Sequence, residues 1–270
     1  MAQLGLHGAL GLYVASRVGG ARRQGATPPE TPAGKPETAD AAARGAGTGA
    51  GTSASVATES AGTKAFKFAY VLGNLLPDVD FFLLGPIYLI NSKVGVTMHR
   101  SFSHSIITIA AVAVLVYALC RSPHRRAVAG GIGLGMLTHV VVDIFVWFSA
   151  VRLLWPLNYA GIPATINLWA SYQPPGWVSN MLGALDSAAI AFYFWYLLRI
   201  ARRRGTDAAY QPRLRFWSVA LLVPSVLLGV LSFVLSRGLF DIVAYAFFIP
   251  FLLPLTLLVT FRMKETIYQA

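Results

Sequence analysis

The sequence contains few charged residues for its length. Asp, Glu, Lys and Arg make up 12% of its 270 residues, whereas 56% of the residues are hydrophobic. Ordinary soluble domains carry about 25% charged residues. The shortage of charge therefore argues against a water-soluble domain and makes the lipid bilayer the expected environment.

Cysteine and acidic residues are scarce as well. The one cysteine, Cys120, excludes an internal disulfide and a cluster of thiolate metal ligands. Only 11 Asp and Glu face 22 Lys and Arg, which gives a formal net charge of +11. These basic residues lie mostly between apolar runs, a placement that reports membrane topology, so no nucleic-acid partner is expected.

Apolar runs long enough to cross a bilayer recur along the chain. A helix needs about 20 apolar residues to span the hydrocarbon core. Five runs approach that length, at positions 102–120, 126–150, 181–198, 216–235 and 239–261. The sequence therefore predicts an all-α fold, a multi-pass helical membrane protein with about five to seven membrane helices.

The distribution of basic residues predicts the orientation of these helices. Lys and Arg cluster in the loop 121–126, in the segment 199–215 and in the tail after Phe261. Because cytoplasmic loops are enriched in these residues, the C-terminus is expected on the cytoplasmic side. The loop at 151–180 is then expected outside, where its tryptophans and tyrosines suit an interfacial aromatic belt.

The composition divides the chain into segments. Residues 19–63 are mainly Gly, Ala, Thr, Pro and Ser, and cannot bury enough apolar surface to offset their ordering entropy. The expected organisation is an N-terminal apolar helix at 1–17, a disordered low-complexity linker at 18–64, a helical membrane core at 65–160, an outer aromatic loop at 161–180 and C-terminal membrane helices at 181–270.

A polar break interrupts the apolar segment 65–90. The residues "PDVD" place Pro77, Asp78 and Asp80 in its middle. A proline breaks the helical hydrogen-bond ladder, and each aspartate in hydrocarbon costs about 2.5–3.5 kcal/mol. We expect a helix broken at Pro77, with the break facing a cavity lined by protein. In the alternative reading, Asp78 caps the helix that follows.

The span 126–150 carries two ionisable residues in "THVVVD". His139 and Asp143 are four residues apart, which places both side chains on one face of a helix. Ionisable residues inside a membrane are candidates for function. The alternative is that the two side chains bond to each other or cap a neighbouring helix.

The stretch "HRSFSHS" precedes another apolar run. His99 and His104 are five residues apart and would diverge by about 140° on one regular helix. They converge if Ser101 or Ser103 is the N-cap, with His99 on the loop before it and His104 in the first turn. Arg100 either holds a phosphate or carboxylate of the substrate or anchors the helix at the membrane interface.

The predicted topology places most of these polar residues at one level of the membrane, toward the outer side. The set of candidate metal ligands is His7, Asp78, Asp80, His99, His104, His139 and Asp143. Imidazoles and carboxylates without thiolates fit a divalent metal, first Zn²⁺ and alternatively Mn²⁺ or Mg²⁺. Seven ligands exceed the needs of one tetrahedral ion, so we expect either two ions or one ion with a supporting shell.

The order of these motifs resembles the YdjM-like family of inner-membrane metal-dependent hydrolases, whose name also carries a LexA-binding label. "PDVD", "HRSFSHS", "THVVVD", "LLWP" at Leu153–Pro156 and an N-terminal histidine carry the resemblance, over residues 1–17 and 70–157. The resemblance implies an inner-membrane location and a metal centre with either Asp78 or Asp80 among its ligands. The carried-over ligands also include His99, His104, His139 and Asp143, with His7 matching the N-terminal histidine. Ser101 and Ser103 depart from the family's usual glycine and threonine.

The residues and the resemblance together predict a membrane hydrolase that cleaves a phosphoester or related ester, such as a lipid head group, with a metal-activated water. Either Asp78 or Asp80 would be the general base, and Arg100 would hold an anionic group of the substrate. Two alternatives stay open. The same cluster would serve a transporter or ion-handling protein, or a structural metal in a membrane scaffold.

Overall fold

The computed structural model of the protein describes residues 4–18, 59–162 and 164–270. The linker expected at 18–64 lies mostly outside these ranges, but its two ends do not. Val18 is the last residue of helix α1, and α2 begins at Ala61, where Ser60 Oγ accepts a hydrogen bond from Thr63 N at 3.2 Å. The prediction of linker at 18 and at 61–64 is therefore wrong, because the chain is helical there.

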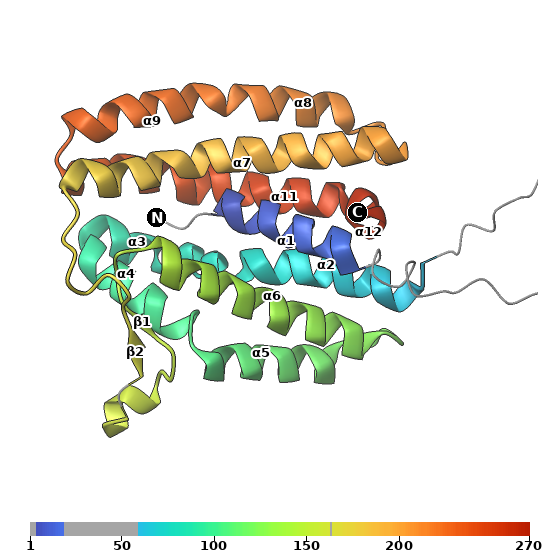
Figure 1. The fold of residues 1–270 in the computed structure, drawn as a ribbon, viewed down its shortest axis with the longest axis horizontal. Helices are drawn as coiled ribbons and strands as arrows, with labels where there is room; N and C mark the ends of the chain where they lie inside the picture. The colour runs from blue at the N-terminus through green and yellow to red at the C-terminus, as the bar shows by residue number, and fades with distance from the viewer. Residues whose placement is uncertain (1–3, 19–58, 163) are drawn as a thin grey trace, which may run out of the picture.

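The described chain is almost entirely helical (Figure 1). Its α-helices are α1 (Leu4–Val18), α2 (Ala61–Leu75), α3 (Phe81–Ile90), α4 (Ser92–Phe102), α5 (Ile106–Leu119), α6 (Arg125–Val146), α7 (Gly176–Arg204), α8 (Gln211–Ala220), α9 (Leu222–Val234), α10 (Arg237–Phe247), α11 (Leu253–Arg262) and α12 (Lys264–Gln269). Shorter helical segments are η1 (Leu76–Asp80), η2 (Leu157–Ala160) and η3 (Phe248–Leu252). The strands β1 (Val151–Arg152) and β2 (Thr165–Ile166) form a short antiparallel hairpin.

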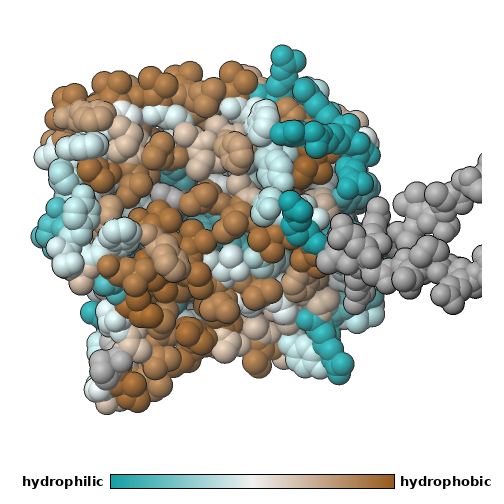
Figure 2. Space-filling model, in the orientation of Figure 1, coloured by the Kyte–Doolittle hydropathy of each residue, from teal (hydrophilic) through white to brown (hydrophobic). Residues whose placement is uncertain are grey.

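Four of the five predicted apolar runs correspond to membrane spans of the structure, whereas the run at 102–120 reaches that length only together with the helix before it. Within the described ranges, five helices are long and apolar enough to cross a bilayer: Ala61–Ile90, Arg125–Val146, Gly176–Arg204, Gln211–Val234 and Arg237–Arg262. Lys93–Phe102 and Ile106–Leu119, bent by 55°, form a sixth span if counted together. The apolar outer surface in Figure 2 suits contact with lipid. The prediction of an all-α, multi-pass membrane protein is confirmed.

Helices α2 and α6 pack backbone against backbone. A Cβ added at Gly135 of α6 would overlap the Tyr70 carbonyl oxygen, and one added at Gly73 of α2 would overlap the Ile132 carbonyl oxygen. Small residues permit such close approach between membrane helices, where van der Waals packing drives association. This contact fixes the register between the end of α2, which leads to the "PDVD" break, and the face of α6 that carries His139.

The N-terminal helix α1 lies among the other helices, between α2 and α7 in Figure 1. Its 15 residues extend about 22 Å, which is shorter than a hydrocarbon core of about 30 Å. Leu4 and Leu12 are fully buried, and Gly5 lies directly against the α7 backbone at Ala189 and Ile190. The short N-terminal helix predicted from the sequence is therefore present, and it packs inside the helical bundle.

The outer aromatic loop, expected at 161–180, ends earlier than predicted. Helix α7 begins at Gly176, directly after two prolines, because a residue before proline is driven away from helical conformation. Trp169 of this loop donates its indole N–H to the Phe145 carbonyl at 3.0 Å and packs edge-on against Phe148. The loop is thereby fastened over the end of α6.

Candidate metal centre

The structure brings all seven candidate ligands into one buried cluster. They come from α1 (His7), η1 (Asp78 and Asp80), α4 (His99), the turn between α4 and α5 (His104) and α6 (His139 and Asp143). Each has 8% or less of its surface exposed. Residues far apart in the sequence thus meet inside the protein.

The residues "PDVD" lie in the 3₁₀ segment η1, and the helix break predicted at Pro77 is present, since α2 ends at Leu75. Neither Asp78 nor Asp80 makes a capping hydrogen bond to the described helices around it, so the reading of Asp78 as a helix cap is wrong. Both carboxylate oxygens of Asp78 are buried without a hydrogen-bond partner in the described part of the chain. The break therefore directs a carboxylate into the cluster instead of satisfying the backbone.

Asp143 joins three parts of the chain. Its Oδ1 lies 3.0 Å from His7 Nε2, and its Oδ2 lies 3.0 Å from His104 Nε2 and 2.9 Å from Arg100 Nη2. His139 and Asp143 do not hydrogen-bond to each other, because His139 Nε2 lies 3.9 Å from Asp143 Oδ2. The alternative reading, in which these two side chains bond to each other, is therefore wrong. The guanidinium of Arg100 supplies the compensating positive charge for this buried carboxylate.

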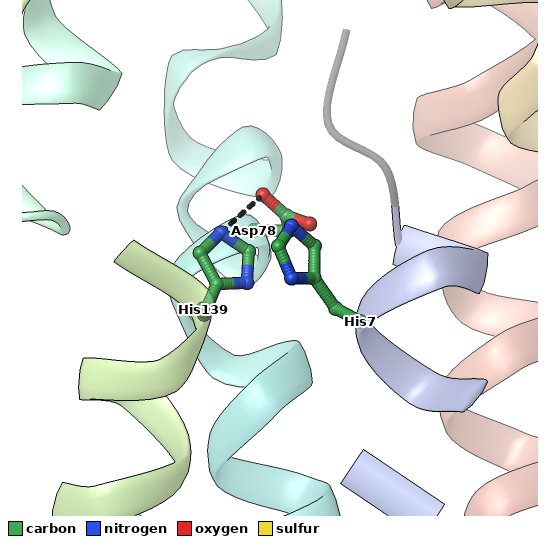
Figure 3. A group of neighbouring side chains, drawn as sticks. All are labelled: His7, Asp78 and His139. Carbon is green, nitrogen blue, oxygen red and sulfur yellow. Dashed lines mark ion pairs between the residues drawn. The ribbon is translucent and has the colours of Figure 1, made fainter. Parts of the chain in front are cut away.

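His139 is held in one tautomer. Its Nδ1 lies 2.7 Å from the Asn74 carbonyl, which can only accept, so Nδ1 carries the proton and Nε2 keeps its lone pair. Figure 3 shows Nε2 directed at Asp78 and the His7 ring beside the His139 ring. The nitrogen lies 3.6 Å from Asp78 Oδ1, and the two rings stack with their centroids 3.6 Å apart. A backbone carbonyl that orients a histidine in this way is typical of the support behind a metal ligand.

The two histidines of "HRSFSHS" converge in a way that differs from the prediction. His99 lies on α4, and His104 lies in the break after it, because Ser105 is the N-cap of α5 and accepts from Ile107 N at 3.1 Å. Ser101 and Ser103 instead donate to the carbonyls of Thr97 and His99, one turn earlier. The expected cap at Ser101 or Ser103, with His99 on a loop, is therefore wrong.

His99 contacts both aspartates of the break. Its Nδ1 lies 2.6 Å from Asp80 Oδ1, and its Nε2 lies 3.6 Å from Asp78 Oδ1. Asp80 Oδ2 has no partner among the described residues. Asp80 thus orients His99 through one oxygen and keeps the other available.

Arg100 is an internal residue. Only 4% of its surface is exposed, and besides Asp143 it donates to the Ser149 carbonyl at 3.3 Å. Its guanidinium lies 5.7 Å from the centre of the Trp147 ring. The alternative reading of Arg100 as an interfacial anchor is therefore wrong.

The cluster contains two groups of atoms that could hold a cation. His7, Asp78 and His139 offer ligand atoms within 4.8 Å of one another, and so do His104, His139 and Asp143. Asp78 Oδ1 and Oδ2, His139 Nε2 and His7 Nδ1 are buried and lack partners in the described ranges. A divalent metal ion would coordinate such buried nitrogen and oxygen atoms, and it needs no thiolate to do so. The residues present therefore fit the implied metal.

Three supporting residues were not identified from the sequence as parts of the site. Asn74 fixes the His139 ring through its carbonyl, Gly135 sets the distance between α2 and α6, and Asp186 of α7 accepts a hydrogen bond from Gly5 N at 3.4 Å. The spacing of Gly131 and Gly135 was a usable signal, since small residues four apart favour close helix contact. The backbone role of Asn74 leaves no signal in side-chain chemistry.

We predict that Gly5→Ala displaces His7 from the cluster. The added methyl group would overlap the α7 backbone at Ala189 and Ile190, so α1 can no longer dock as it does. Amide hydrogen exchange should become faster across Leu4–Val18, and metal affinity should fall by about tenfold or more. Gly229→Ala, which no described atom would contact within 4 Å, is the matched control. Unchanged exchange in Gly5→Ala would contradict the docking role.

These features define a class of protein: a multi-pass α-helical membrane protein with a buried histidine–aspartate cluster among its helices. The model of the YdjM inner membrane protein family matches residues 42–236, which is more than half of the chain. The protein belongs to this family, and the resemblance seen in its motifs is confirmed. It is an integral inner-membrane protein. His7 lies before the matched residues, so the family model does not cover it, and the structure places it in the cluster. No curated protein and no solved structure matches the chain.

Proposed function

We propose that this protein is an integral-membrane, metal-dependent hydrolase that cleaves a phosphoester or related ester at the membrane. The observation that carries the proposal is the buried carboxylate of Asp78, which has no hydrogen-bond partner among the described residues. Asp143 is compensated by Arg100 and Asp80 is bonded to His99, but the nearest histidine nitrogens lie 3.6 Å from Asp78 Oδ1. An isolated buried carboxylate costs several kcal/mol, and a divalent cation beside it removes that cost.

Five residues of the cluster are metal ligands under this proposal. His7, Asp78 and His139 hold one ion, and His104 and Asp143, sharing His139, provide the position for a second. A divalent ion there supplies Lewis-acid activation of water and stabilises charge at phosphorus. Zn²⁺ fits this donor set best, with Mn²⁺ or Mg²⁺ as alternatives.

Asp80 is the residue that we assign as general base. It belongs to neither group of ligand atoms, its Oδ2 has no partner within the described ranges, and at 8% it is the most exposed member of the cluster. The His99 ring, 2.6 Å from Oδ1, holds the carboxylate in place while Oδ2 accepts a proton from water. Arg100, already bonded to Asp143, has further N–H donors for an anionic group of the substrate.

The centre is proposed to face the non-cytoplasmic half of the membrane. Arg125 at the start of α6 and Arg202–Arg204 at the end of α7 lie at one end of the bundle. The strongly hydrophilic surface in Figure 2 gathers at that end, over the end of α7. His139 lies in the second half of α6 (Arg125–Val146), away from that end. Positive residues favour the cytoplasm, so the cluster points the other way and the C-terminus is cytoplasmic.

Metal analysis coupled to an activity screen tests the proposal. Protein purified in non-ionic detergent should contain one or two divalent ions per chain and hydrolyse bis-p-nitrophenyl phosphate or p-nitrophenyl phosphate. A chelator should lower turnover by about 100-fold or more, and the metal found by analysis should restore it. Protein that holds no stoichiometric metal would refute the proposal. Bound metal without turnover of any ester would favour the transport or structural alternatives instead.

A further inference from the structure

A partly open pocket adjoins the metal centre and shares two residues with it. His99 and Arg100 form one side of the pocket, and its other walls come from α3, α7, α10 and the segment after α6. Whatever enters this pocket therefore lies next to the cluster.

Two buried hydrogen-bond donors in the lining are unsatisfied. Tyr88 Oη and Trp147 Nε1 have no partner among the described residues, although Tyr88 is only 2% exposed and Trp147 only 9%. An indole N–H can donate but not accept, so its partner must bring an acceptor. Buried polar groups without partners are rare and point to a missing ligand or water.

Two guanidinium groups of the lining offer hydrogen-bond donors to a ligand. Arg237 of α10 donates a hydrogen bond to Ser179 Oγ at 3.1 Å. Arg100 donates one hydrogen bond to Asp143 and one to the Ser149 carbonyl. Both guanidinium groups keep further N–H donors. Asp241, one turn after Arg237 on α10, is the acidic side chain of the pocket lining, and Arg100 is already paired with Asp143. The case for a ligand with acceptor atoms therefore rests on the remaining N–H groups, not on an excess of positive charge.

We propose that this pocket binds the phosphoryl group of a membrane amphiphile and holds it beside the metal centre; this rests on the proposed hydrolase function and names its substrate class. A phosphoryl group offers several acceptor oxygens, which match the two arginines and the two unsatisfied donors. Phe81, Val96 and Phe240 add apolar surface to the same pocket, which suits the non-polar part of a lipid. Tyr88, Trp147 and Arg237 are therefore substrate-binding residues.

The test measures binding separately from hydrolysis. Inorganic phosphate and dihexanoyl phosphatidic acid are titrated into the detergent-purified, metal-containing protein while tryptophan fluorescence is followed. We expect a saturable signal that Trp147→Phe removes, and affinity roughly tenfold weaker in Tyr88→Phe and in Arg237→Gln. Tighter binding of phosphatidic acid than of phosphate would identify a lipid head group as the source, and equal affinity would overturn the lipid part of the proposal.

Matched controls and a parallel assay separate the two proposals. Tyr13→Phe on the exposed face of α1 and Arg202→Gln at the far end of α7 should bind phosphate like the unaltered protein. Equal affinity in these controls and in Tyr88→Phe and Arg237→Gln would overturn the pocket, even if the protein hydrolyses esters. In contrast, pocket-dependent phosphate binding by protein without metal or turnover would overturn the hydrolase proposal alone. Where turnover is present, Arg237→Gln should raise KM and leave kcat nearly unchanged.

Discussion

Asp78→Asn should release the metal from the protein while leaving the fold intact. The substitution keeps the shape of the side chain and removes its charge, at the position where both buried oxygens have no partner in the described chain. Because a neutral amide is a much weaker ligand, we expect metal affinity to fall by about 100-fold or more. The metal content of purified protein, measured by elemental analysis, is the readout.

The same variant should also differ from the unaltered protein in how chelation changes its melting temperature. Chelation should lower the melting temperature of the unaltered protein, since removing a ligand at 1,000 times its Kd costs about 4 kcal/mol and leaves Asp78 uncompensated. Asp78→Asn should show little change on chelation, because the buried charge has already gone. His124→Ala, in the loop before α6 and away from the cluster, should retain both the metal and the chelation effect. Full metal content in Asp78→Asn would contradict the proposed centre.

Gly135→Ala should destabilise the protein and weaken metal binding together. The new Cβ would overlap the Tyr70 carbonyl oxygen and approach the backbone of Gly73 and Asn74, so α2 and α6 must move apart. Overpacking of this kind typically costs about 1–3 kcal/mol. The shift would also carry the Asn74 carbonyl away from His139, so metal affinity should fall together with the melting temperature.

Gly130→Ala is the matched control on the same helix. No described atom lies within 4 Å of the position of its added Cβ, and Gly130 is exposed. Replacing a helical glycine by alanine without a clash generally stabilises by about 0.4–1 kcal/mol. Thermal unfolding in detergent should therefore separate the two variants in opposite directions. Equal melting temperatures would show that the α2–α6 contact can relax.

The break at "PDVD" was predicted well because its cause is local. Pro77 cannot continue the hydrogen-bond ladder of α2, and the α-helix indeed ends just before it, at Leu75. The capping of α5 was predicted poorly, although it is also local. Ser101, Ser103 and Ser105 are all acceptable N-caps, and only the direction of the chain after α4 decides that Ser105 takes the position.

The membership of His7 in the cluster shows what could not be derived locally. Nothing near His7 in the sequence specifies where α1 goes, since a long segment outside the described residues separates α1 from α2. Its place depends on Gly5 and Gly8 fitting against α7, and on Asp186 accepting from the end of α1. These contacts lie more than a hundred positions apart, and the 3.0 Å approach of His7 to Asp143 depends on them.

The sequence by itself determined that the chain is embedded in a bilayer and that its few internal ionisable residues cluster. Hydrocarbon penalises each unpaired charge, so seven such side chains must find one another or a cation. Only the tertiary structure decided which side chains pair. Asp143 pairs with Arg100 and Asp80 with His99, whereas Asp78 lies 3.6 Å from two histidine nitrogens and has no hydrogen-bond partner among the described residues. Which side chains pair depends on how the helices are rotated and how closely they approach one another. The distances between the helices are set by close glycine contacts across the bundle, and these cannot be read from the residue types along the chain.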